Sequence, residues 1–256
     1  MIGPFILMYH SIANDSDDPY SVSVDSFREQ ISWLSDSEFG VVSLSFLLRS
    51  IQLRNFSDLR KKVVITFDDG CKDFIDNALP ILLEYQVPAT VFLVTQLLGK
   101  TASWSMSENN VPLMTEDDVR LIKSRGINLG SHSATHENLT LLDHRELHRQ
   151  LQDSYDRLTD FGESFYPFAY PWGQWSRNVV NALIATGYEC AVAVGEQTRM
   201  TASDTYYLPR ISMLRDMDSK RFRSLLTRTR IAMELRRTCR VALRGVGFER
   251  LRTSEE

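Results

Sequence analysis

The alternation of strand-like and helix-like segments is the feature that most constrains how this chain folds. Short runs rich in Val, Ile and aromatic residues have the composition of β-strands, and they lie at residues 4–10, 41–44, 61–67, 89–94, 127–132, 166–173, 190–194 and 206–211. Helix-like segments follow most of them, at residues 24–39, 45 onward, 74–85, 115–126, 143–161 and 177–186. Strands joined through helices run parallel, because each helix carries the chain back to the starting edge of the sheet. Seven or eight such strands predict a closed or nearly closed (β/α) barrel of the α/β class over residues 1–215.

Length and composition agree with one barrel. Such barrels typically take about 250 residues, and this chain has 256, of which 43% are apolar and 24% charged. The three cysteines, at positions 71, 190 and 239, form no CxxC pair, which favours a reducing compartment over a disulfide framework. We expect "MIGPFILMYH" to be a first strand and not an export signal, because no basic region precedes its short apolar run. These features predict a cytoplasmic protein. Residues 96–113 are rich in Ser and Asn and are expected to form an irregular loop.

The charge of the chain is unevenly distributed. Residues 219–256 contain eleven Lys and Arg and four Glu, a net charge of +7, so the first 218 residues carry −11 of the total of −4. We expect residues 216–256 to be a C-terminal basic helical extension. Its apolar residues suit two roles. Residues 219–252 could contact the anionic inner face of the membrane, or they could pack against the barrel and leave the arginines in solvent. Nucleic acid is not an expected partner, because the acidic remainder would repel it.

Unusual polar residues stand where the predicted strands end. In parallel barrels the chemistry lies at the carboxyl ends of the strands, which meet on one rim. The residues at these ends are His10, the pair Asp68 and Asp69 in "VVITFDDG", His132 with His136 four residues on, Pro171 to Gly173, and Arg210. Asp-Asp-Gly is also ordinary turn chemistry. Five such ends on one rim favour a functional site.

One aspartate and two histidines suit a divalent metal. Imidazole is a good ligand for zinc, and a carboxylate completes three ligands with an open position. We expect His132 and His136 to share a face of a helical turn; the alternative is a pair of ordinary loop histidines. The second aspartate is then free to act on metal-bound water. A further pair, His144 and His148 in "HRELH", lies in an amphipathic helix and lacks a Glu directly after the first His, so we do not expect it to bind metal.

Several motifs resemble those of the polysaccharide deacetylase family, the chitin-deacetylase-like carbohydrate esterases. "TFDDG" (66–70) and "HSATH" (132–136) are similar to its first two motifs, and "YPWG" (170–173) resembles its third. "LMYHSI" and "LPRI" resemble a bacterial branch of the family, and the resemblance covers roughly residues 5–215.

The resemblance implies a role for each matching residue. Asp68 would be the catalytic base. The metal, for which zinc is the expected ion, would be held by Asp69, His132 and His136. The segment Tyr170, Pro171, Trp172 and Gly173 would bind substrate, with the backbone N–H of Trp172 facing the oxyanion. For Trp175, sugar stacking and core packing both remain open.

The resemblance also implies a distorted (β/α) barrel of seven or eight strands, and it implies the reaction. The expected function is that of a metal-dependent hydrolase that removes an acetyl group from an N-acetylated sugar of a poly- or oligosaccharide. The alternatives are a deformylase or related C–N hydrolase acting on a lipid-linked aminosugar, and a catalytically silent carbohydrate-binding protein of the same fold.

Two departures from the family pattern suggest substitutes. Ala169 stands where the third motif has Arg, and no histidine follows His148 to match the late Leu-x-His of the family, which supplies the general acid. His10 is the only histidine left on the rim, so we expect it to be the general acid or to hydrogen-bond a metal ligand or Asp68. Arg210 would supply the missing guanidinium beside Asp68 and keep that carboxylate ionised.

Overall fold

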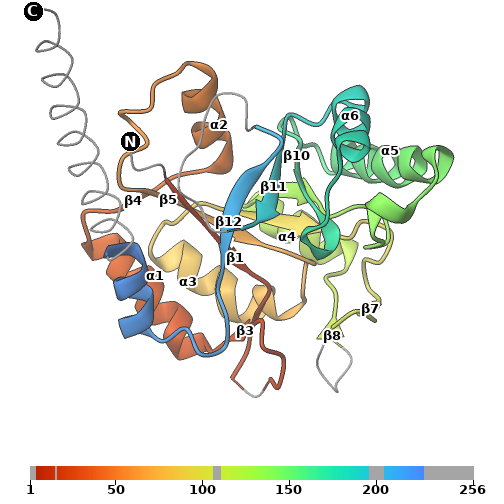
Figure 1. Cartoon of the computed structure of the whole chain (residues 1–256). Coiled ribbons are helices and arrows are strands. Elements are labelled where there is room, and N and C mark those ends of the chain that lie inside the picture. Colours follow the sequence, from red (N-terminus) through yellow and green to blue (C-terminus); the bar gives the residue numbers. More distant parts are fainter. Residues whose placement is uncertain (1–3, 15, 106–110, 196–204, 228–256) are drawn as a thin grey trace, which may run out of the picture.

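Seven parallel strands close into a barrel (Figure 1). The computed structural model describes residues 4–14, 16–105, 111–195 and 205–227. β1 pairs with β5 on one side and with β12 on the other, and this double pairing closes the ring. In order around the barrel, the strands are β1 (Phe5–Tyr9), β12 (Leu208–Ser212), β11 (Cys190–Val194), β10 (Pro167–Ala169), β9 (Asn128–Ser131), β6 (Ala89–Leu93) and β5 (Lys62–Phe67). The predicted barrel is confirmed, with seven strands; β4 (Gly40–Val41) pairs only with the start of β5.

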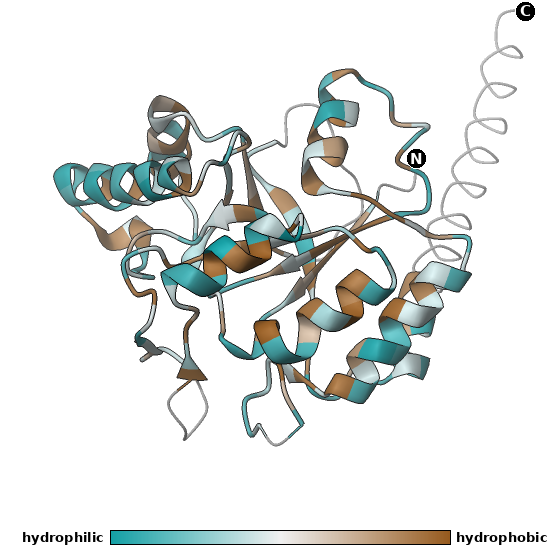
Figure 2. Ribbon diagram, turned by 180° about the vertical axis from the view of Figure 1, so that it is seen from behind, coloured by the Kyte–Doolittle hydropathy of each residue, from teal (hydrophilic) through white to brown (hydrophobic). Residues whose placement is uncertain are grey.

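Helices surround the barrel with their apolar sides inward and hydrophilic residues outward (Figure 2). Most of the α-helices have a side-chain cap at the N-terminus; α4, for example, begins with a capping box between Thr115 and Asp118. The helices are α1 (Val24–Asp36), α2 (Leu44–Gln52), α3 (Leu79–Glu84), α4 (Glu116–Ser124), α5 (His144–Asp160) and α6 (Arg177–Thr186), and the short helices are η1 (Phe74–Ala78, a π-helix), η2 (Leu139–Leu141) and η3 (Pro171–Gly173).

Two local expectations are wrong. The loop predicted for residues 96–113 contains a hairpin, β7 (Thr101–Ala102) with β8 (Val111–Pro112), which is too short to give a periodic pattern. The strand predicted for 166–173 ends at Ala169, because Pro171 fixes a turn into η3. A second small pair, β2 (Ser11–Ile12) with β3 (Ser21–Val22), lies after β1.

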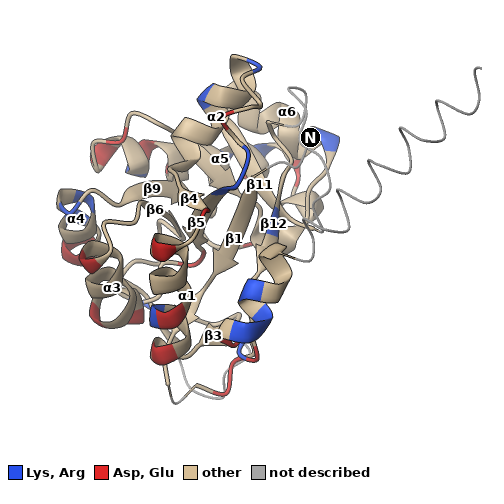
Figure 3. Cartoon of the chain, turned by 90° about the vertical axis from the view of Figure 1, so that its left-hand side faces the viewer, with Lys and Arg blue, Asp and Glu red and all other residues tan. Residues whose placement is uncertain are grey.

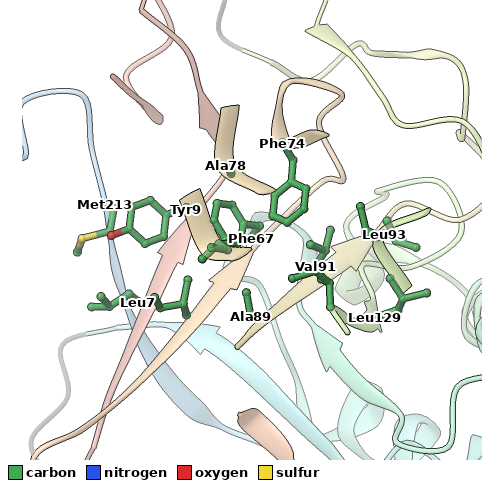
Figure 4. Packing of buried hydrophobic residues seen from close by; sticks show 14 of the residues in the cluster. Leu7, Tyr9, Phe67, Phe74, Ala78, Ala89, Val91, Leu93, Leu129 and Met213 are labelled. Carbon is green, nitrogen blue, oxygen red and sulfur yellow. The ribbon is translucent and has the colours of Figure 1, made fainter. Parts of the chain in front are cut away.

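Alternate residues of each barrel strand face opposite sides, as the two-residue period requires. On β1 and β5, Leu7, Tyr9 and Phe67 point outward and pack against the helical layer. Figure 4 shows Tyr9, Phe67 and Phe74 in a row beneath η1, with Phe67 and Phe74 edge to face at 4.8 Å between ring centroids. This outer layer fixes the strand register, and therefore which residues point into the barrel.

The barrel interior is filled at one end. The inward residues of the strands form a second apolar cluster with α2, which lies across the end where the strands begin (Figure 1). The members from the strands are Ile6, Val64, Phe92, Ala169, Cys190, Val192 and Leu208. The carboxyl ends of the strands lie at the opposite end, beside the β7–β8 hairpin.

The last described segment, residues 219–227, is helical and packs on α1. Phe222 and Leu226 are fully buried, and the ring of Phe222 meets Trp33 edge to face at 5.9 Å. Several residues of this segment are Lys or Arg (Figure 3). The predicted boundary at residue 216 stays a prediction, because residues 228–256 lie outside the described part. Among the described helices, none combines the length and apolar character needed to span a membrane.

Candidate active site

A pocket of about 270 Å³ opens at the carboxyl ends of the strands. The walls come from β-strand ends, from the loop between β2 and β3 and from the β7–β8 hairpin. The structure therefore brings together residues predicted from the sequence that lie far apart in the chain: His10, Asp68, Asp69, His132, His136, Tyr170, Trp172 and Gly173.

The Asp-Asp-Gly turn after β5 sends the two carboxylates in different directions. Alternation along β5 makes Thr66 and Asp68 inward residues of the barrel. Asp69 then adopts φ 70° and Gly70 φ 76°, the left-handed region that a turn of this kind needs. A Cβ on Gly70 would lie 2.9 Å from Cδ2 of Leu93, so any larger residue would also require the Leu93 side chain to shift. Asp69 consequently turns across the pocket while Asp68 stays in the barrel.

Asp69, His132 and His136 form a compact group of ligand atoms. Oδ1 of Asp69 lies 3.6 Å from Nε2 of His132 and 3.5 Å from Nε2 of His136. Two ligands each about 2.1 Å from one tetrahedral ion are roughly 3.4 Å apart, so these spacings fit zinc. All three residues are buried, and Oδ1 of Asp69 accepts no hydrogen bond from the described residues, as expected for an atom reserved for a metal.

The His132 ring is held in the tautomer that a metal needs. Its Nδ1 donates to the carbonyl oxygen of Ala169 at 2.8 Å, and because a carbonyl only accepts, the lone pair is left on Nε2. Burial, together with the neighbouring His132, lowers the pKa of His136 to about 2, so that ring is neutral as well.

The two histidines do not share a helical turn, contrary to the expectation. Residues 132–138 form a loop in which Ser133 (φ 65°) and His136 (φ 64°) are left-handed. The loop is stabilised by side chains instead of helical bonds: the N–H of His136 donates to Oγ of Ser133 at 3.0 Å, and that of Thr135 donates to Oε1 of Gln150 at 3.1 Å. His132 is placed by the end of β9, and His136 by this loop.

Asp68 makes a bidentate ion pair with Arg210 inside the barrel. Both oxygens accept from the guanidinium at 2.6 Å, and the Arg210 side chain also donates to Oγ1 of Thr66 at 3.2 Å. Burial alone would raise the pKa of Asp68, but the charge and hydrogen bonds of Arg210, with a contribution from His132, lower it to about 2. The Arg210 guanidinium also lies 5.5 Å above the ring of Phe92.

His10 directly follows the last residue of β1 and lines the same pocket. Its ring contacts Tyr20, with 4.8 Å between centroids. Burial lowers the pKa of His10, and of its charged neighbours Asp68 opposes this effect while Arg210 adds to it. The imidazole therefore lies within electrostatic reach of the Asp68–Arg210 pair.

The segment 170–173 forms the wall beside His136. Tyr170 is buried and donates from its hydroxyl to the carbonyl of Tyr206 at 2.8 Å. Trp172 has φ 60°, an uncommon value for a bulky residue that signals a functional constraint. The indole N–H of Trp172 donates to the carbonyl of His136 at 3.1 Å.

Sequence reasoning missed Trp104, which follows β7 in the connection to β8. The ring of Trp104 stacks on His136, with 4.1 Å between centroids and 11° between planes. Its neighbour Ser105 donates to Oδ2 of Asp18 at 2.8 Å, which joins the hairpin to the loop between β2 and β3. No periodicity marks this segment, so a lone aromatic residue carried no signal.

The second histidine pair lies elsewhere. His144 and His148 are on the outer side of α5, with ring centroids 4.5 Å apart. Neither belongs to the Asp69–His132–His136 group, and neither lines the pocket.

A barrel that presents an Asp–His–His set beside a second, ionised carboxylate belongs to the class of metal-dependent hydrolases. The family model for polysaccharide deacetylase matches residues 57–191, more than half of the chain. The chain belongs to the polysaccharide deacetylase family, and it is a metal-dependent hydrolase that deacetylates carbohydrate. The resemblance drawn from the motifs is thereby confirmed.

Two curated relatives support this assignment. A putative polysaccharide deacetylase of Bacillus subtilis, YxkH, is 28% identical over 220 residues, covering 85% of this chain and 74% of the relative. A poly-β-1,6-N-acetyl-D-glucosamine N-deacetylase of Staphylococcus aureus is 26% identical over 202 residues, covering 75% of this chain and 67% of the relative.

Solved structures show the same fold. The deacetylase PplD of Streptococcus pyogenes has a TM-score of 0.75 and 24% identity, covering 86% of this chain and 96% of its own. IcaB from Ammonifex degensii has a TM-score of 0.75 and 18% identity, covering 90% and 97%. At these identities the likeness concerns the fold.

Proposed function

We propose that this protein removes the N-acetyl group from β-linked N-acetylglucosamine units of a glycan, with zinc as its metal. The observation that carries the proposal is the Asp69–His132–His136 group next to an Asp68 carboxylate that Arg210 keeps ionised. The substrate class comes from the Staphylococcus aureus relative, which carries N-deacetylation of poly-β-1,6-N-acetyl-D-glucosamine in its name.

The donor set supports zinc. Two imidazoles and one carboxylate leave a fourth position for water or a carbonyl oxygen. A metal in this group supplies Lewis acidity and lowers the pKa of a bound water. The chain's own task is to hold two neutral imidazoles and one carboxylate at the spacings described, and the bond from His132 to Ala169 does this for one ring.

Asp68 is the proposed general base. The pKa of about 2 means that its carboxylate is ionised at neutral pH, as a general base has to be before it accepts a proton. Both of its oxygens accept from Arg210, so the guanidinium fixes the orientation of the carboxylate as well as its charge. Arg210 is thus a positioning residue that reaches the site from β12. It supplies the guanidinium that Ala169, on β10, lacks.

His10 is the proposed general acid. The departing amine needs a proton, and His10 is the histidine of the pocket that the metal group does not use. The same position also permits a hydrogen bond to a metal ligand or to Asp68. His10→Ala separates these roles, because loss of the acid removes the alkaline limb of the pH–rate profile and leaves the metal content unchanged.

We also propose that the basic tail contacts an anionic membrane surface. The sequence supports this through the eleven basic and several apolar residues between positions 219 and 252. Phe222 and Leu226 already pack on α1, so the contact would rest on residues after 227.

The reaction is tested with a β-1,6-linked N-acetylglucosamine pentamer and separate detection of acetate and formate. Acetate release by the zinc-loaded protein is expected. Formate release from an N-formyl analogue alone would favour the deformylase, and turnover of neither would favour the silent carbohydrate-binding protein. Asp68→Asn keeps one acceptor oxygen for Arg210, so it is expected to retain metal and lose turnover; loss of metal would show that the two aspartates are misassigned.

The metal is tested by elemental analysis of matched histidine variants. His136→Ala removes one of three ligands and is expected to lower metal occupancy sharply. His148→Ala, on the outer side of α5, is expected to keep it. Equal loss in both variants would contradict the ligand assignment.

A further inference from the structure

The π-helix η1 is joined to β2 by polar bonds. It lies on the outer side of the barrel, with Tyr9, the last residue of β1, beneath it (Figure 4). Asp73, at the start of this helix, accepts from Oγ of Ser11 at 2.5 Å and, over a longer distance of 3.4 Å, from the N–H of Ile12. Asn77 of η1 donates to the carbonyl oxygen of Ile12 at 2.7 Å. We call Asp73 and Asn77 the β2 anchor.

The Asp73 side chain serves β2 and not its own helix. An aspartate at the start of a helix commonly accepts from the free backbone N–H groups there, but Asp73 makes no capping bond. Its partners are a hydroxyl and an amide in place of a cation from the described residues. Burial raises the pKa of Asp73 to about 6, and the bonds from Ser11 and Ile12 oppose this effect. A carboxylate buried without a cation costs free energy, and such costs are expected at functional sites.

The place of β2 determines the place of the proposed general acid. His10 is the single residue between β2 and β1, and β1 is fixed by its pairing in the barrel. Among the described residues Nδ1 of His10 has no hydrogen-bond partner. The ring contacts Tyr20, which directly precedes β3, the partner strand of β2. The imidazole therefore depends on the β2–β3 pair both through its own backbone and through its aromatic neighbour.

We propose that Asp73, together with Asn77, positions His10 for proton transfer to the departing amine. This inference rests on the proposed function and deepens it. In that step the His10 imidazolium gives a proton to the substrate nitrogen as the C–N bond breaks, and the electron pair of that bond stays with the amine. Asp73 and Asn77 do not line the pocket, so they act through His10 and not on the reacting atoms.

Two substrates separate proton delivery from the rest of the reaction. The N-acetylglucosamine pentamer loses an amine, which needs a proton, whereas para-nitrophenyl acetate loses a phenolate, which leaves without one. In the zinc-loaded protein Asp73→Ala is expected to lower kcat for the pentamer about tenfold at unchanged KM, because a small misplacement of a catalytic group is enough for such a loss. Hydrolysis of para-nitrophenyl acetate is expected to stay unchanged. Asp73→Asn restores most of the turnover, since its amide can still accept from the N–H of Ile12 and donate to Oγ of Ser11.

A double-mutant cycle tests whether Asp73 acts through His10. In the His10→Ala protein, Asp73→Ala is expected to cause no further loss of kcat for the pentamer, because the group that it positions is gone. Asp76→Asn is the matched control, since Asp76 is an exposed carboxylate of the same helix, and it is expected to leave kcat unchanged. Asn77→Ala removes only the bond to the carbonyl of Ile12. It is expected to lower turnover of the pentamer alone, and it replaces Asp73→Ala if that variant does not fold.

NMR of the histidine rings tests the position of His10 without any turnover. The signals of His10 are identified by their loss in His10→Ala. Asp73→Ala is expected to shift or double them and to leave those of His144 and His148, on α5, unchanged. The proposal is overturned if the His10 signals do not move, if both substrates lose turnover equally, or if the losses in the double variant are additive. Shifted His10 signals in a protein that does not deacetylate the pentamer would uphold the β2 anchor and contradict the proposed function.

Discussion

Asp68 and Asp69 are adjacent in the chain, yet the pKa of one carboxyl group is lowered and that of the other raised. Both are buried, and burial alone raises the pKa of each. For Asp68 the bidentate Arg210 reverses this effect and gives a pKa of about 2. For Asp69 burial prevails over His132, the negative Asp68 adds to it, and without metal the pKa is about 6. One turn thus provides a permanently ionised carboxylate and one that needs a cation.

The raised pKa of Asp69 predicts competition between protons and metal. Below about pH 6 the metal-free carboxyl group is protonated and must release its proton before it can bind. We expect metal affinity to fall roughly tenfold per pH unit below that value and to level off above it. His136 adds no competition there, because its pKa is about 2. Chelator competition between pH 5 and pH 8 measures this, and an affinity independent of pH over that range would contradict it.

The buried Asp68–Arg210 pair predicts strong coupling in stability. Arg210→Leu leaves a buried carboxylate without its partner and is expected to cost about 3–5 kcal/mol in the free energy of unfolding. In Asp68→Asn/Arg210→Leu both charges are gone, so the loss is expected to be smaller than the sum of the single losses. Chemical denaturation of the three variants measures the coupling.

An exposed ion pair provides the comparison. Arg149 pairs with Glu146 on the surface of α5, and Arg149→Leu is expected to change the free energy of unfolding by less than about 1 kcal/mol. Additive losses in the Asp68 and Arg210 variants would show that the buried pair is not coupled.

At the scale of single residues, the sequence predicted positions better than local conformations. Strand ends on one rim were enough to bring His10 and Asp68 to the same end of the barrel, because parallel strands have only one carboxyl end. Arg210 was expected at the end of the last strand but lies in the middle of β12, and its side chain extends to Asp68. The loop conformation of "HSATH" was not predictable, since it depends on Gln150 of α5, which is remote in sequence. A local pattern contains no information about such a partner.

At the scale of elements, the β7–β8 hairpin is the addition that completes the site. Its Trp104 covers one face of the proposed ligand His136. Elements with a clear period, such as α5 and β5, were predicted to within a few residues. The two-residue strands of the hairpin were not, because they are stabilised by tertiary contacts such as the bond from Ser105 to Asp18.

The stack predicts that Trp104 affects the metal without binding it. Trp104→Ala frees the His136 ring to rotate and is expected to lower metal affinity about tenfold, in the range seen for residues that orient ligands. Trp104→Phe keeps a flat ring and is expected to retain most of the affinity. Chelator competition is the measurement. Trp33→Ala, on α1, is the control that changes an aromatic contact away from the pocket; an unchanged affinity in Trp104→Ala would show that the stack has no such role.

At the scale of the whole molecule, charge is segregated between the barrel and the end of the chain. The first 218 residues carry −11 and the remainder +7. The packing of residues 219–227 on α1 was one of the two roles left open by the sequence, which gives no means of deciding between a membrane and a neighbouring helix as the partner of an apolar face.

This separation predicts where membrane contact lies. Residues 228–252 contain eight arginines and two glutamates, and each basic residue near an anionic surface contributes about 1 kcal/mol. We expect the whole chain to sediment with anionic vesicles, and less so at high salt, whereas a chain ending at residue 227 stays in solution. That shorter form keeps Phe222 and Leu226, so the packing of this segment on α1 is retained. Equal sedimentation of both forms would contradict the proposal.

Because α2 fills one end of the barrel, we expect the two products to leave the enzyme in a fixed order. That end of the barrel is filled by Leu44, Leu47 and the strand residues of the same cluster, and in the part of the chain that the structure describes the pocket opens at the strand ends. The acetyl group has to enter ahead of its sugar to reach the metal group, so the acetate is formed behind the glycan. We therefore expect the glycan to leave first and the acetate last. Acetate, as the last product to leave, is then the one that competes with the incoming substrate for the free enzyme.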